Sequence, residues 1–343
     1  PIYFLIVSNL FLNLYSNNKI YIPLYTCLCL GASSLEYRKL IKFGNSSHVI
    51  SLPNSWLKKN KLNKGNVIYL NENGNNELIL SPEKKEEVVE MKEKVISLDK
   101  QSDDDVIREI ISAYTNNFKK IKIVGEDLDK KYDLIRQTLP NLVAVEIIEH
   151  TSTTLVLQDF LDIESIALKK IIRRLDILIK SMLTDSRNTL QKDRYFSLME
   201  RDKDINRLTI LATRVANFYL MRPEKIKPPE SLKTIFQFFV IADNMERFAD
   251  ESKRIARVLR TVKPSKDLAN MIDRIYGILE HTFSEVMESY YLHNLPLSLK
   301  TRKTIREEVL PLCNEFSDRI KEKKYAIIIE KLKTMGNHII VIG

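Results

Sequence analysis

Beyond Asp159, the chain consists of long amphipathic segments that contain few glycines. Apolar residues recur in them at the three- and four-residue spacing of a helix that buries one face. Proline-bearing stretches such as RPEKIKPPES and KPSKD separate the segments, and Pro264 divides them into three and three. Two tandem three-helix bundles are therefore predicted, with helices over residues 163–183, 193–221, 232–262, 268–292, 299–322 and 325–343.

Two pairs of carboxylates occur on the second and third predicted helices. Glu200 and Asp204 are four residues apart, as are Glu246 and Asp250, so each pair shares a helix face. Like charges at this spacing repel by roughly 0.2–0.5 kcal/mol, which calls for compensation. Either a metal ion or cluster with oxygen ligands lies between the helices, or the charges are neutralised on a solvated face by neighbouring Arg201, Lys203, Arg207, Arg247 and Arg254.

The segments MERDKDINRL and ADNMERFADESKRIA, which contain these pairs, resemble the two metal-binding motifs of the PhoU family. The resemblance runs from about residue 163 to residue 343 and implies tandem three-helix bundles that hold a metal cluster. That cluster is usually iron, with zinc, manganese or magnesium as alternatives. Carried over to this chain, the ligands are Glu200, Asp204, Glu246 and Asp250, with Asp243 as a further candidate.

The second predicted bundle departs from this pattern. In the segment LKTMGNHI, Lys333 and Asn337 stand where the resemblance implies Glu and Asp. A lysine repels a cation, so we expect at most one well-formed cluster per chain and a degenerate or truncated second repeat. Neither Glu200 nor Glu246 is followed three residues later by a histidine, which argues against a di-iron oxidase. We expect no enzymatic activity.

Residues 37–56, YRKLIKFGNSSHVISLPNSW, predict a basic strand, a polar turn at Gly44 and an apolar strand that ends at Pro53. Asn54 opens a short helix, and a second strand pair is predicted over residues 67–70 and 78–80. So short a stretch cannot bury its own core. We therefore expect an intertwined homodimer.

The same stretch, with KKNKLNKGNVIYL and ELILSP after it, resembles the AbrB/MazE-like (SpoVT-AbrB) DNA-binding domains over about residues 36–82. The resemblance implies a swapped-hairpin β-barrel that binds double-stranded DNA. Seven basic residues against three acidic ones in this stretch suit phosphate contacts, although lysines also serve simply to solvate a surface. The residues expected on or beside the DNA-facing surface are Arg38, Lys39, Lys42, Asn45, Ser46 and His48.

Between the two ends, residues 84–94 are charged and indicate a linker or connecting helix. A helix starting at residues 103–105, a strand over 121–124 and a hairpin over 143–149 and 154–157 predict a small α/β module for structural coupling or dimer contact. Residues 1–33 are largely apolar but lack the basic start of a signal sequence and the length of a membrane span. We interpret them as an atypical or artefactual extension, with a membrane anchor as the alternative.

The predicted fold is thus multidomain α+β, with boundaries at 1–33, 34–83, 84–160 and 161–343. With its AbrB-like start, the segment VAVEIIEHTSTTLVLQDFLD and its PhoU-like helices, the chain resembles archaeal PhoU-type phosphate uptake regulators that carry an N-terminal DNA-binding domain. Three cysteines cannot form an even disulfide framework, so a reducing cytoplasm is the compartment that fits best. The net charge of +9 favours an anionic partner. The resemblance thus implies a DNA-binding regulator of phosphate uptake. The alternative function is that of a metal-binding adaptor, which docks on a phosphate transporter or sensor kinase and uses its N-terminal domain only to dimerise. A third possible function is that of an antitoxin with a long effector tail.

Overall fold

The computed structural model describes residues 37–44, 47–72, 78–83, 93–262, 264–320 and 322–343. The chain divides into two compact units, residues 1–69 with 80–84 and residues 70–79 with 85–343. The apolar extension predicted over residues 1–33 lies outside the described residues. Within the described ranges, no helix is both long enough and apolar enough to cross a membrane.

The N-terminal part contains short strands and one short helix, as predicted. β1 (Ile41–Phe43) pairs antiparallel with β2 (Ser47–Val49), and β3 (Tyr69–Glu72) pairs with β4 (Leu78–Ser81). Pro53, whose fixed φ suits a helix start, directly precedes α2 (Asn54–Lys59). A closed swapped-hairpin barrel is not seen among these described strands, which form two separate two-stranded sheets.

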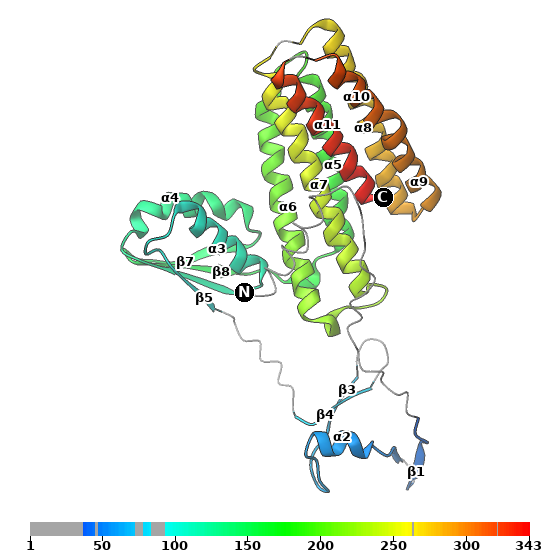
Figure 1. The fold of residues 1–343 in the computed structure, drawn as a ribbon. Coiled ribbons are helices and arrows are strands. Elements are labelled where there is room, and N and C mark those ends of the chain that lie inside the picture. Colours follow the sequence, from blue (N-terminus) through cyan, green and yellow to red (C-terminus); the bar gives the residue numbers. More distant parts are fainter. Residues whose placement is uncertain (1–36, 45–46, 73–77, 84–92, 263, 321) are drawn as a thin grey trace. The chain divides into compact units, whose positions relative to one another are not determined.

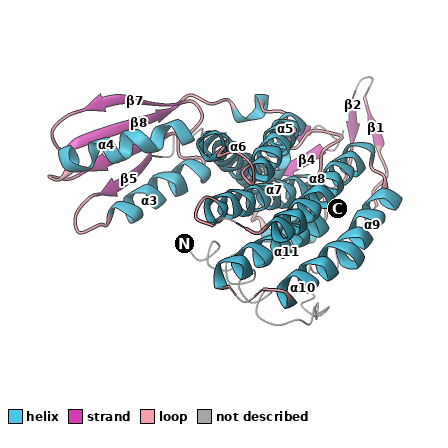
Figure 2. Cartoon of the chain, turned by 90° about the horizontal axis from the view of Figure 1, so that it is seen from above, coloured by secondary structure: helices cyan, strands magenta, loops and turns pink. Residues whose placement is uncertain are grey.

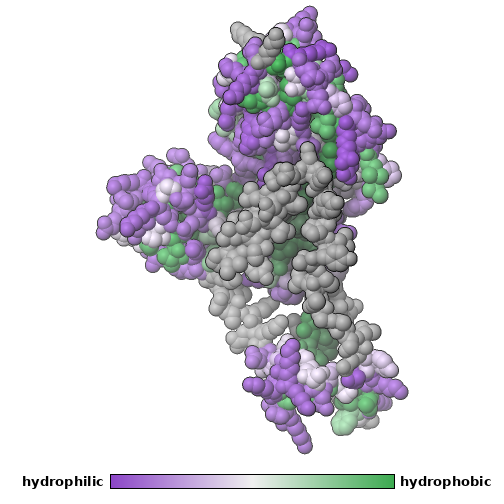
Figure 3. Space-filling view, in the orientation of Figure 1, coloured by the Kyte–Doolittle hydropathy of each residue, from purple (hydrophilic) through white to green (hydrophobic). Residues whose placement is uncertain are grey.

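Apolar side chains in this part remain in contact with solvent. Ile41, Phe43 and Val49 are 57%, 69% and 42% exposed. Figure 3 shows hydrophobic surface, in green, on the part of the chain where Figure 1 places α2 and β1. No side chain whose burial is described between residues 37 and 83 is buried. A single copy of this segment therefore forms no core of its own, as its length predicts.

The α/β module is a four-stranded sheet with two helices on one face (Figure 1). The sheet has the order β5-β6-β8-β7; β5 and β6 are parallel and the other neighbours are antiparallel. Its elements are β5 (Glu93–Ser97), α3 (Asp103–Thr115), β6 (Lys120–Val124), α4 (Leu128–Thr138), β7 (Val145–His150) and β8 (Thr154–Asp159).

The predicted elements of the module are found, together with two that the sequence did not predict. α3 begins where Ser102 Oγ accepts a hydrogen bond from Asp105 N, and its buried Val106, Ile110 and Tyr114 share one face. Of the linker or connecting helix predicted over residues 84–94, residues 84–92 lie outside the described residues, and the prediction is wrong for residues 93–94, because they begin β5 beside β6. The other unpredicted element is α4.

The remaining chain is helical and shares one hydrophobic core. The predicted helices correspond to α5 (Leu168–Asn188), α6 (Tyr195–Met221), α7 (Leu232–Leu259), α8 (Lys266–Leu292), an interrupted fifth helix and α11 (Lys323–Ile342). The fifth comprises α9 (Leu295–Thr304), a π turn (Ile305–Val309) and α10 (Leu310–Asp318). Viewed from above in Figure 2, α5, α6 and α7 form one group, and α7 also packs against α11.

A buried ion pair joins the α/β module to α6. The Arg214 guanidinium donates to both carboxylate oxygens of Asp159, over 2.9 and 2.5 Å. The two side chains are 0% and 2% exposed. Arg214 also lies over the Tyr114 ring, 4.2 Å from its centroid, and donates to Asn117 Oδ1. The module and the helical part thus share a network of polar contacts.

The network explains the ionisation of Asp159. Burial alone would raise the pKa of this carboxyl, but hydrogen bonds from Arg214 and Lys119 outweigh it and hold the pKa below the ordinary value. Lys119 Nζ lies 2.7 Å from Asp159 Oδ2 and also donates to the Leu161 carbonyl. Asp159 is therefore charged at neutral pH and depends on its cationic partners.

We predict that Arg214→Met lowers the free energy of unfolding by about 3–5 kcal/mol, because it leaves the Asp159 carboxylate buried without its main partner. The double variant Arg214→Met/Asp159→Asn should recover part of that loss, since it removes both charges. Denaturant unfolding of the full chain measures both changes. Equal destabilisation by the two variants would show that the charge on Asp159 has no part in the loss.

A second buried polar pair connects α7 and α11. His338 Nδ1 lies 3.0 Å from Asn244 Oδ1, and His338 is 9% exposed. Burial, reinforced by the nearby Arg247 and opposed by Asp243, lowers the pKa of His338 to about 4. The imidazole is therefore neutral in the folded chain at neutral pH.

This depressed pKa predicts a loss of stability in acid. Between the unfolded pKa of roughly 6.5 and about 4, the unfolded chain takes up a proton that folded His338 does not. At pH 5 the free energy of unfolding should therefore fall by about 2 kcal/mol more, relative to pH 7.5, in the native chain than in His338→Gln. Urea titrations at both pH values test this; parallel losses in the two proteins would contradict it.

Candidate functional site

The α6 carboxylates that the sequence singled out lie on the outside of the bundle. Glu200 and Asp204 are exposed, and Glu200 accepts a hydrogen bond from Lys203 at 2.8 Å. Each residue of a helix is rotated by about 100° from the one before it, so residues two apart point to nearly opposite sides. Buried Asp202, between the two, therefore faces inward. The structure does not bring Glu200 and Asp204 together with the acidic residues of α7.

The α7 carboxylates lie beside one another on that helix. Burial, with the charges of Asp250 and Asp243, raises the pKa of Glu246 to about 7. Asp202 on α6 also contributes to this shift, which places it near Glu246. The acidic residues that act on Glu246 are thus the predicted Asp243 and Asp250 together with Asp202, which takes the place of the predicted Glu200 and Asp204.

Lys253 lies between two of these carboxylates. Its Nζ is 2.8 Å from Asp202 Oδ1 on α6 and 2.6 Å from Asp250 Oδ1 on its own helix. The Lys253 side chain is only 13% exposed. Arg254 pairs with the second oxygen of Asp250 at 2.7 Å, and Arg247 pairs with Asp243 at 2.8 Å. Cations supplied by the chain thus contact three of the four carboxylates.

This arrangement does not fit a metal cluster. Among the residues that the structure describes, no three His, Cys, Asp or Glu side chains gather as a metal site would require. The oxygens of Asp202 and Asp250 that face each other across α6 and α7 already bind an ammonium. A metal ion at the same position would have to displace the Lys253 ammonium. Because Lys253 is part of α7, the displaced ammonium would stay close to the ion.

Sequence spacing could have identified Asp202. It lies four residues after Leu198 and three before Ile205, both of which are buried, so it falls on the apolar stripe of α6. Glu200 and Asp204 lie off that stripe. The pairing of Lys253 with Asp250 also follows helical spacing, because the two are three residues apart.

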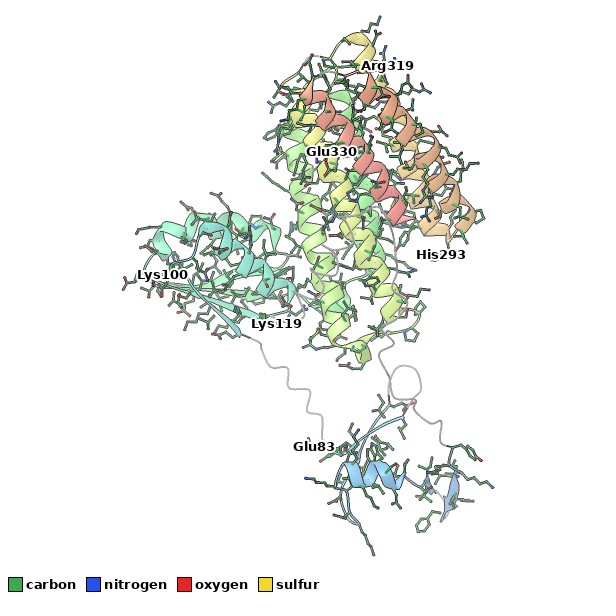
Figure 4. The ribbon with its side chains drawn as sticks, in the orientation of Figure 1. Glu83, Lys100, Lys119, His293, Arg319 and Glu330 are labelled. Carbon is green, nitrogen blue, oxygen red and sulfur yellow. The ribbon has the colours of Figure 1, made fainter. Side chains whose placement is uncertain are left out.

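In the second bundle, Lys333 and Asn337 stand at the positions of the motif. Asn337 is exposed, and half-buried Lys333 lies near buried Cys313. Burial raises the pKa of that thiol to about 11, with a small opposing effect of Lys333. Glu307 and Glu308 lie exposed on the π turn. Figure 4 marks this bundle by His293, which follows α8, and by Glu330 on α11.

The predicted nucleic-acid interface is partly described. Lys42 is directly opposite His48 in the β1–β2 hairpin, so both point to the same face, while Ile41 and Val49 point to the other. Arg38 and Lys39 precede β1 and are exposed. The turn residues Asn45 and Ser46 lie outside the described residues. The hairpin thus presents a basic face and an apolar face.

Comparisons with known proteins found a family model and a solved structure that are similar to part of the chain. No curated protein matches the chain significantly. Among solved structures, the crystal structure of PhoU from Pseudomonas aeruginosa is 16% identical, with a TM-score of 0.44, over 51% of this chain and 91% of that one. Residues 172–259, which comprise most of α5 and all of α6 and α7, match the PhoU domain.

Proposed function

We propose that this protein is a DNA-binding regulator of phosphate homeostasis and not an enzyme. The observation that carries the proposal is the match of residues 172–259 to the PhoU domain, in a chain that also presents an exposed basic hairpin. The PhoU domain supports the role in phosphate homeostasis. The hairpin supports DNA as the binding partner. We place the protein in the cytoplasm.

The chemistry of the hairpin supports duplex DNA as the partner. Arg38, Lys39 and Lys42 are exposed and precede or lie on β1, and His48 lies opposite Lys42 on β2. Ammonium and guanidinium groups bind phosphates and release counterions from the duplex. In this proposal Asn45 would reach a base edge or a phosphate, and Ser46 would lie on or beside the same DNA-facing surface.

The exposed apolar face of the same hairpin supports a homodimer. Ile41 and Val49 are opposite each other on this face, and Phe43 is also exposed. A second copy that covers these side chains would give the segment the core that it lacks in a single chain. Two hairpins brought together in this way would present two basic faces to one duplex.

The second candidate function is an adaptor for a phosphate transporter or sensor kinase, in which the N-terminal part only dimerises. The PhoU domain favours it as much as it favours the first function. DNA affinity separates the two, because the adaptor needs no phosphate contacts. The predicted iron cluster is not part of this proposal, since Lys253 lies between the carboxylates that face each other.

We predict that Lys39→Ala/Lys42→Ala weakens binding to a random-sequence duplex and lowers the slope of log affinity against log salt by roughly two per chain, because about two phosphate contacts are lost. Fluorescence anisotropy over a salt series measures both. Lys323→Ala/Lys324→Ala removes the same charge from exposed positions on α11 and serves as the control. The DNA-binding function fails if the native chain shows no salt-dependent binding, or if both double variants behave alike.

We predict that the native chain is a dimer and that Ile41→Asp/Val49→Asp makes it a monomer, because two carboxylates would have to be buried where the apolar faces meet. Sedimentation equilibrium of the full chain measures the change. Ile177→Asp, at a residue of α5 that is 69% exposed, is the matched control and should leave the dimer intact. A native chain that sediments as a monomer contradicts the prediction.

A further inference from the structure

We propose that Lys253 is the resident cation of the α6–α7 interface and that the PhoU domain of this chain keeps its structure without a metal ion. The inference goes beyond the proposed function, which does not depend on it. It rests on the position of one ammonium group between carboxylates of two helices.

The geometry of Lys253 is that of a bridging cation. Its Nζ lies 2.8 Å from Asp202 Oδ1 and 2.6 Å from Asp250 Oδ1, distances typical of charge-assisted hydrogen bonds. Asp202 belongs to α6 and Asp250 to α7, so one ammonium joins the two helices. A metal ion bound by carboxylates from neighbouring helices would make the same connection.

The surroundings keep the ammonium in place. The Lys253 side chain is 13% exposed and that of Asp202 is 9% exposed, so little water competes for either charge. The second oxygen of Asp250 is taken by Arg254 at 2.7 Å. Asp250 therefore has both oxygens paired with cations from its own helix, and a metal ion at either oxygen would have to compete with an ammonium or a guanidinium.

A metal ion would also be at a disadvantage in competition. Lys253 is covalently attached to α7, so its effective concentration at the site stays high whatever the ionic composition of the solution. A divalent cation that displaced it would remain close to the displaced ammonium and be repelled by it. We therefore expect the α6–α7 interface to bind Lys253 in preference to a divalent metal ion.

The experiment compares metal content and thermal unfolding of the full chain, with Mn²⁺, Fe²⁺ and Zn²⁺ as probes. The native chain, dialysed against each metal, should retain well below one ion per chain, and EDTA should leave its melting temperature unchanged. Lys253→Met should melt roughly 5–10 °C lower, because Asp202 loses its cation. It should also gain binding of Mn²⁺ and be restabilised by it.

Two further variants keep the test decisive. Asp202→Asn/Lys253→Met removes both charges and should neither bind Mn²⁺ nor respond to EDTA. This double variant replaces Lys253→Met in the test if Lys253→Met does not fold. Lys203→Met removes an exposed lysine that pairs with Glu200, and it should leave the melting temperature nearly unchanged. A native chain that holds about one metal ion or more, and that melts lower once EDTA removes it, overturns the proposal. So does a Lys253→Met variant with native melting temperature.

Discussion

The buried pair of Arg214 and Asp159 is the interaction on which the arrangement of the larger unit depends. The pair connects the end of β8 to the C-terminal half of α6, and both side chains are almost fully buried. A buried ion pair adds little net stability over an apolar contact, but its directional hydrogen bonds are satisfied in one arrangement only. The Tyr114 ring beneath the guanidinium and the Asn217 bond to the Thr115 carbonyl, at 3.1 Å, fix the end of α3 as well. The module, for which structural coupling or dimer contact is predicted, is thus held to the helical part by buried polar contacts.

The long helices could be predicted from the sequence, whereas parts of the α/β module could not. Each long helix carries its own apolar stripe, and serine caps at Ser231 and Ser265 define two of their starts. α4 has a weak stripe in which only Leu128, Ile135 and Thr138 are buried. β5 follows a charged run and owes its strand structure to its pairing with β6, which local sequence does not specify.

The acidic motif shows why spacing alone did not locate the site. Two carboxylates four residues apart share a face of a helix, but the spacing does not tell which face. On α6, Glu200 and Asp204 face solvent, while Asp202 lies on the stripe of Leu198 and Ile205. The contribution of Lys253 depends on contact across two helices, which only the folded structure reveals.

Polar side chains of α7 contact both α6 and α11, which restrains how α7 can turn in the bundle. Asn244 pairs with His338 of α11, Glu251 lies 3.3 Å from the Lys331 ammonium of the same helix, and Lys253 binds Asp202 of α6. Because these side chains project from one rigid helix toward different neighbours, α7 cannot turn about its axis to release one partner without straining the others. One helix, α7, thus joins α6 and α11 through side-chain contacts of defined direction, so its rotation is restrained from both sides.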